Sequence, residues 1–154
     1  MSRKILIPRA AVSALAAASL LGALPGSAGA AVPRAGYYSG TTAQQAGAVD
    51  FKVFKYGSFD GPVRKLLKVG ATTQLTCASG EVKEDRYVAY IILGGKIDRL
   101  GRFKYTYKGF TIRGRFTSRT SAKGTLSRTV GDCKAENVGW TAKRTTAGIP
   151  IPTA

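Results

Sequence analysis

The fold is decided by residues 103–142, which read FKYTYKGFTIRGRFTSRTSAKGTLSRTVGDCKAENVGWTA. Short runs of alternating apolar and polar residues follow one another here, separated by glycines, and this pattern is typical of strands joined by tight turns. The stretch also contains Cys133, the only tryptophan (Trp140) and the densest group of basic residues in the chain. We predict that it forms the centre of an all-β domain.

A two-residue turn at Lys108-Gly109 would fix how the first two strands pair, because glycine readily adopts the positive φ that such turns need. The facing residues then separate onto two faces of the hairpin. The apolar face pairs Tyr107 with Phe110, Tyr105 with Ile112, and Phe103 with Gly114. The polar face pairs Thr106 with Thr111, Lys104 with Arg113, and Arg102 with Arg115. A register that sorts the side chains so fully favours this hairpin.

The polar face is a candidate binding site. The next strand, Ala122–Leu126, would place Ala122, Gly124 and Leu126 inward and one further cation outward, next to the hairpin. Five cations would then share this face: Arg102, Lys104, Arg113, Arg115 and Lys123. Like charges that face each other destabilise a sheet, unless solvent screens them or an anion bridges them. The hypothesis is a phosphate- or sulfate-binding face, and the alternative is an ordinary solvated one.

Trp140 belongs to the last predicted strand, in which Val138, Trp140 and Ala142 alternate with polar or small residues. A tryptophan on an apolar face is usually buried, so we place it in the core. The alternative is an exposed platform for sugars.

Several further strands are predicted before residue 103. They cover Gly36–Thr41, the alternating stretch Val49–Val53, Val63–Val69 and Thr72–Cys77. A bulge or a second buried face is needed near Phe54, and Val63–Val69 would also suit a short helical face. Ala78–Asp85 is expected to be a polar loop, and the apolar run Tyr87–Leu93 a central strand covered on both faces. The whole reads as a single antiparallel β-sandwich or flattened barrel of about eight or nine strands.

The first 30 residues have the pattern of a cleaved signal peptide, with a basic start, an apolar run and a small-residue cleavage site at Ala28-Gly29-Ala30. The apolar run, Ala10–Leu24, is shorter than the roughly 20 residues that span a bilayer, so an uncleaved anchor is the less favoured reading and no transmembrane segment is expected after cleavage. Residues 31–35 are expected to be a flexible mature terminus, 36–144 the β domain and 145–154 a flexible tail.

Cysteine usage and charge agree with export. Cys77 and Cys133 are the only cysteines, and a pair in an exported protein is most simply a disulfide. The chain has 24 basic and 8 acidic residues, and removing the three basic residues of the signal leaves a net charge of +13. Such a charge attracts polyanions or serves solubility alone. In an exported protein the polyanions would be cell-envelope polymers, anionic lipid or extracellular nucleic acid.

The residues needed for common catalytic chemistry are missing. There is no histidine, which removes Ser-His and Cys-His nucleophiles and histidine-bound metals. Glu81, Glu84 and Asp85 lie close together in the sequence, and a glycosidase needs two carboxyl groups, but acidic loop clusters are mostly solvated. We therefore expect no enzyme activity, no cofactor and no metal.

The order of motifs resembles a group of short exported proteins of high-GC Gram-positive bacteria. These share a G-R-F, A-x-G-T-L, Cys and W-T-A-x-R succession, which stands here as Gly114–Phe116, Ala122–Leu126, Cys133 and Trp140–Arg144. The likeness extends to Gly36–Thr41 and Cys77. It implies an all-β domain with one disulfide, and it brings no catalytic or binding residues with it.

Three functions follow in order of preference. The first is a secreted, non-catalytic protein that binds an anionic polymer or surface through its cationic face. The second is a structural or interaction protein of the cell surface without a small ligand. The third is a hydrolase acting on an extracellular polymer.

Overall fold

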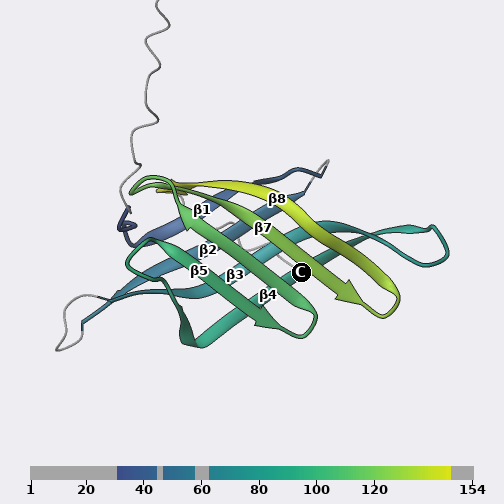
Figure 1. Cartoon of the computed structure of the whole chain (residues 1–154), viewed down its shortest axis with the longest axis horizontal. Coiled ribbons are helices and arrows are strands. Elements are labelled where there is room, and N and C mark those ends of the chain that lie inside the picture. The colour runs from purple at the N-terminus through teal and green to yellow at the C-terminus, as the bar shows by residue number, and fades with distance from the viewer. Residues whose placement is uncertain (1–30, 45–46, 58–62, 147–154) are drawn as a thin grey trace, which may run out of the picture.

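The computed structural model describes residues 31–44, 47–57 and 63–146, and the described chain forms one antiparallel sheet of eight strands (Figure 1). The predicted signal peptide, residues 45–46 and 58–62, and residues 147–154 of the predicted tail lie outside this part. The strands are β1 (Gly36–Thr42), β2 (Ala48–Tyr56), β3 (Val63–Thr76), β4 (Val82–Lys96), β5 (Arg102–Tyr107), β6 (Phe110–Phe116), β7 (Ser121–Val130) and β8 (Cys133–Thr145). The predicted all-β class is confirmed.

The sheet curls back on itself into a flattened barrel. Its strand order is β4-β3-β2-β1-β8-β7-β6-β5, and two further pairings join distant strands: Thr76 with Lys134, and Ile97 with Phe103. In Figure 1, β5, β7 and β8 cross in front of β2, β3 and β4. The main core lies between these two layers, and a smaller buried cluster surrounds the Cys77–Cys133 pair.

Aromatic rings fill the core where the layers cross. The ring of Phe51 on β2 lies 5.1 Å from that of Tyr38 and 5.7 Å from those of both Phe103 and Trp140, measured between centroids. All four side chains are buried. Contacts of this kind are worth about 0.5–1.5 kcal/mol per pair beyond the burial of area. The predicted burial of Trp140 is confirmed, with 3% of its surface exposed.

The β5–β6 hairpin has the predicted register. Lys108 and Gly109 both have positive φ (44° and 70°), as a two-residue turn of this kind requires. All six facing pairs are those expected, from Tyr107 with Phe110 to Arg102 with Arg115. One residue departs from the prediction: Tyr107 lies at the open end of the barrel and is half exposed (50%).

The two strands predicted at Val63–Val69 and Thr72–Cys77 are one long strand, β3. The prediction placed a break between two strands at Gly70, but β3 continues through this residue. A Cβ at Gly70 would lie 2.7 Å from Oδ1 of Asp50 on the neighbouring strand β2, so the missing side chain makes room for that carboxylate. The irregularity expected near Phe54 is found as a register shift at Lys52/Val53.

The segment from Ala78 to Leu93 also differs from the prediction. The polar loop is shorter than Ala78–Asp85, because β4 starts at Val82. The run beginning at Tyr87 belongs to an edge strand and not to a central one, since β4 pairs along its length only with β3. Val88 and Tyr90 accordingly point to solvent, whereas Ala89 and Ile91 point to the core.

The predicted disulfide between Cys77 and Cys133 is present and joins the end of β3 to the start of β8. At the other end of the barrel, residues 31–35 lie against the domain. The Arg34 amide donates to the Arg119 carbonyl (2.9 Å), and Arg64 Nε donates to the Pro33 carbonyl (3.0 Å). Within the described residues, no helix is long and apolar enough to cross a membrane.

Candidate anion-binding groove

The sheet register brings the five predicted cations together on the outer face of β5–β7. Arg115 on β6 faces Arg102 on β5 and Lys123 on β7, which gives a row of three cations across three strands. Two residues along the same strands, Lys104 faces Arg113. All five side chains are exposed. The structure therefore has the five cations on one outer face, as the sequence predicted.

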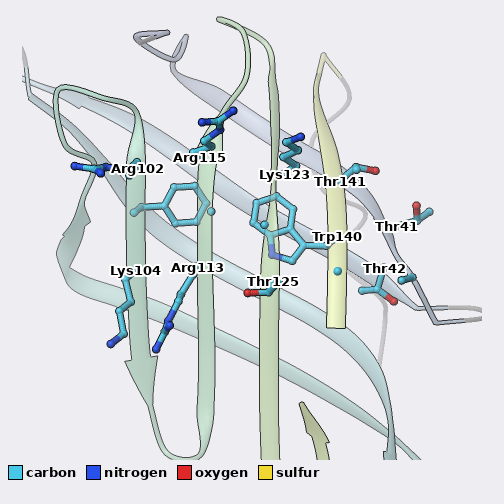
Figure 2. Close-up of a pocket in the computed structure, with 15 residues that line it drawn as sticks. Thr41, Thr42, Arg102, Lys104, Arg113, Arg115, Lys123, Thr125, Trp140 and Thr141 are labelled. Atoms are coloured by element: carbon cyan, nitrogen blue, oxygen red, sulfur yellow. The ribbon is translucent and has the colours of Figure 1, made fainter. Parts of the chain in front are cut away.

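A shallow open groove of about 830 Å³ lies between these cations, and all five line it. Figure 2 shows Arg102, Arg115 and Lys123 along one side of the groove and Lys104 and Arg113 along the other. Toward β8 and β1 the outward positions hold small residues, so the surface is hollowed there. These small lining residues are Thr41, Ala43, Thr125, Gly139 and Thr141.

Glycines let the core rings lie directly beneath the groove. A Cβ at Gly114 on β6 would stand 2.5 Å from Cζ2 of Trp140 and 2.7 Å from Cζ of Phe103, both of which pack on the inner side. Gly139 on β8 points outward instead. A Cβ there would meet only the Ala43 side chain, at 3.8 Å. The groove floor is thus closely packed at Gly114 and has room for a larger side chain at Gly139.

Only one of the five cations has an acidic partner in the described part of the chain. Arg102 Nε donates to Asp98 Oδ2 (2.8 Å), and the Arg102 amide donates to Asp98 Oδ1 (2.8 Å). The backbone amide of Arg102 and then its guanidinium lower the pKa of Asp98. Among the described residues, no carboxylate lies within ion-pair distance of Lys104, Arg113, Arg115 or Lys123. The groove therefore carries a strong net positive charge.

A second hollow of about 460 Å³ continues the groove toward β1. The two hollows share Thr41, Lys123 and Thr141. The second adds a sixth cation, Lys143, and three hydroxyl groups, those of Ser39, Thr117 and Ser121. Sequence reasoning missed Lys143, although the same alternation that places Trp140 and Ala142 inward places Lys143 outward.

The acidic residues Glu81, Glu84 and Asp85 lie at or directly before the start of β4, and two of them form ion pairs. Glu81 pairs with Lys83 (3.0 Å), and Asp85 pairs with Arg128 (2.7 Å). Glu84 and Asp85 are neighbours on strand β4 and so point to opposite faces of the sheet. The one group of possible metal ligands found in the described residues is Cys77, Asp132 and Cys133, and its two sulfurs are joined in the disulfide.

Comparison of the chain with models of protein families, with curated proteins and with solved structures gave no match. The resemblance to short exported proteins of high-GC Gram-positive bacteria stays a prediction.

Proposed function

We propose that this is an exported, non-catalytic protein that binds a linear anionic polymer along the β5–β8 groove. The observation that carries the proposal is the set of four cations, Lys104, Arg113, Arg115 and Lys123, that surround a hollow without a carboxylate partner in the described chain. Facing cations destabilise a sheet, and a bound anion would turn that repulsion into attraction.

The shape of the groove favours a polymer over a single small anion. Its two hollows are continuous, because they share Thr41, Lys123 and Thr141, and together they cross β5 to β1. Five cations line the β5–β7 part of this path, and Lys143 and several hydroxyl groups line the part toward β8 and β1. Repeated phosphate, sulfate or carboxylate groups would therefore find a donor at several successive points. A cell-envelope polymer or extracellular nucleic acid has such repeats, and the headgroups of an anionic lipid surface offer the same chemistry.

Salt-dependent binding tests the proposal. The protein should be retained on heparin resin and not on a neutral matrix, and its affinity for long-chain polyphosphate should fall steeply as salt rises, because binding releases counterions. The double variant Arg113→Glu, Arg115→Glu should lose most of this affinity.

The matched control is Lys83→Glu, Lys134→Glu, which changes the net charge by the same amount at the disulfide end of the barrel, where both lysines pair with glutamates. The control should bind nearly as well as the parent protein. Equal losses in the two double variants would show that only overall charge attracts the polymer, and the proposed groove would be wrong.

A neutral variant separates the hollow from its charge. Gly139→Leu adds volume to the groove floor, where a Cβ has room, and leaves every cation in place. We expect it to weaken polyphosphate binding while the salt dependence keeps its slope. Unchanged affinity would indicate that the polymer does not enter the hollow, and would favour the alternative of a cell-surface protein whose cationic face is incidental.

A further inference from the structure

A second row of charged and aromatic side chains crosses the opposite layer of the barrel. Neighbouring strands pair Tyr37 on β1 with Lys52 on β2, Lys52 with Lys68 on β3, and Lys68 with Tyr90 on β4. These four residues share the outer face of their layer, and we call them the tyrosine–lysine row. With strands about 4.8 Å apart, the row spans roughly 14 Å.

Each lysine of the row lies over the ring of its neighbouring tyrosine. Lys52 Nζ stands 4.8 Å from the centroid of the Tyr37 ring, and Lys68 Nζ stands 5.4 Å from that of Tyr90. Tyr90 still exposes 73% of its surface. A third pair of the same kind lies beyond the end of the row, where Lys65 Nζ stands 5.5 Å from the Tyr56 ring. The Tyr56 ring is exposed as well (57%), whereas Tyr37 is half-buried.

This alternation fits a ligand with flat rings joined by negative charges. Surfaces that bind single strands of nucleic acid combine aromatic rings, on which bases stack, with cations that contact the phosphates. Here a ring and an ammonium group recur within about 5 Å of each other, so a base and its own phosphate could be contacted together. A neutral glycan could also stack on the tyrosines, but it would gain little from the lysines.

The other charges on this face leave it positive. Asp50, two residues along β2 from Lys52, lies half-buried against Gly70 in the next row. Burial raises the pKa of Asp50, while Lys68 and Arg86 act in the opposite direction. Asp50 is therefore surrounded by cations, and the exposed part of the face presents lysines and rings.

We propose that the tyrosine–lysine row is a second binding site, separate from the groove, and that it takes single-stranded nucleic acid by stacking bases on Tyr90 and Tyr37. The row runs across β1–β4 and the groove lies chiefly on β5–β8, and both reach β1, where Tyr37 of the row is two residues from Ser39 of the second hollow. A protein with both could hold two anionic chains at once.

The test compares two oligonucleotides with the same phosphates, oligo(dT) and an abasic strand of equal length, by fluorescence anisotropy. The parent protein should bind oligo(dT) more tightly. Tyr90→Ala should weaken oligo(dT) binding about 5- to 150-fold, the range found for loss of one stacked base, and leave binding of the abasic strand unchanged. Tyr90→Phe should keep the preference, because it keeps the ring.

The control is Tyr107→Ala, which removes a half-exposed ring that also lies under a lysine, Lys108 (5.3 Å), at the hairpin turn outside the row. It should not change the preference. The proposal is overturned if the parent protein shows no preference for oligo(dT), or if Tyr90→Ala keeps that preference. It is also overturned if the parent protein binds a neutral glucan oligosaccharide and Tyr90→Ala abolishes that binding without affecting oligo(dT). The charge-reversal variant Arg113→Glu, Arg115→Glu tests the groove independently: it should lower binding of both strands and leave the Tyr90-dependent preference intact.

Discussion

Reversing one charge at the centre of the groove should make the protein more stable while it weakens polymer binding. Arg115 faces Arg102 on one side and Lys123 on the other, and the Arg115→Glu substitution replaces two repulsive cross-strand contacts with two attractive ones. Each such contact is worth about 0.2–1 kcal/mol, so the free energy of unfolding should rise by about 0.4–2 kcal/mol. Because Arg102 is already paired with Asp98, we expect the lower half of that range.

The measurement is urea denaturation of the Arg115→Glu and Arg115→Gln variants and of the parent protein at low and high salt. The glutamine variant removes repulsion without adding attraction and should fall between the other two. At about 1 M salt the Debye length is only about 3 Å, so the differences should shrink. Arg119→Glu controls for net charge, because this exposed loop residue has no ion pair in the described chain.

Two results would refute this reasoning. One is an Arg115→Glu variant that is no more stable than Arg119→Glu at low salt. The other is a gain in stability that persists unchanged at 1 M salt, since a Coulombic effect between exposed side chains cannot do so. If the gain is found together with lost polyphosphate binding, the cations are kept at the expense of stability, as expected of a binding site.

Three further predictions concern the fold. Gly114→Ala should lower the free energy of unfolding by about 1–3 kcal/mol, because its Cβ would overlap the rings of Phe103 and Trp140. Gly139→Ala should change the free energy of unfolding by less than about 0.5 kcal/mol, because its Cβ has room. Urea denaturation of both variants checks this, and equal stabilities would contradict the packing described. Reduction of the Cys77–Cys133 disulfide, which closes a separation of 56 residues, should cost roughly 4 kcal/mol, and thermal unfolding with and without reductant measures it; an unchanged Tm would contradict it. Burial, and then a hydrogen bond with Tyr105, raises the pKa of Tyr87 to about 12, so the neutral phenol stabilises the fold below pH 10 and this contribution is lost as the pH rises toward 12. Between pH 10 and 12 the stability of the parent protein should therefore fall more than that of Tyr87→Phe. Alkaline unfolding followed by circular dichroism measures this difference, and identical curves for the two proteins would argue against it.

The hairpin and its cationic face could be predicted because local chemistry alone determines them. Aromatic and basic residues alternate along both strands that flank the Lys108-Gly109 turn, and one register places the two kinds on opposite faces of the hairpin. The position of Trp140 follows in the same way from its neighbours. In each case the side of the sheet on which a residue lies depends only on its place in the alternation.

The features that could not be predicted depend on which strands become neighbours. The apolar run from Tyr87 onward would suit a central strand, but β4 lies at an edge, and no local pattern distinguishes the two positions. Gly70 resembles a strand break until Asp50 is placed against it. The hollow of the groove likewise requires Ala43, after β1, to lie next to Gly139 on β8, and the sequence offers no signal for that contact.

The pairing of the first strand with the last has a consequence for biosynthesis. β1 lies between β2 and β8, with Thr41 facing Thr141, so the barrel cannot close until the chain has emerged through β8. Such a high contact order makes folding slow, since distant segments must meet before their contacts can stabilise the fold. In the export that we propose, the unclosed chain would pass through a translocation channel, and Cys133, the first residue of β8, would meet Cys77 only late in that passage. Completion of the barrel, oxidation of the disulfide and assembly of the groove are thereby coupled to the same final step.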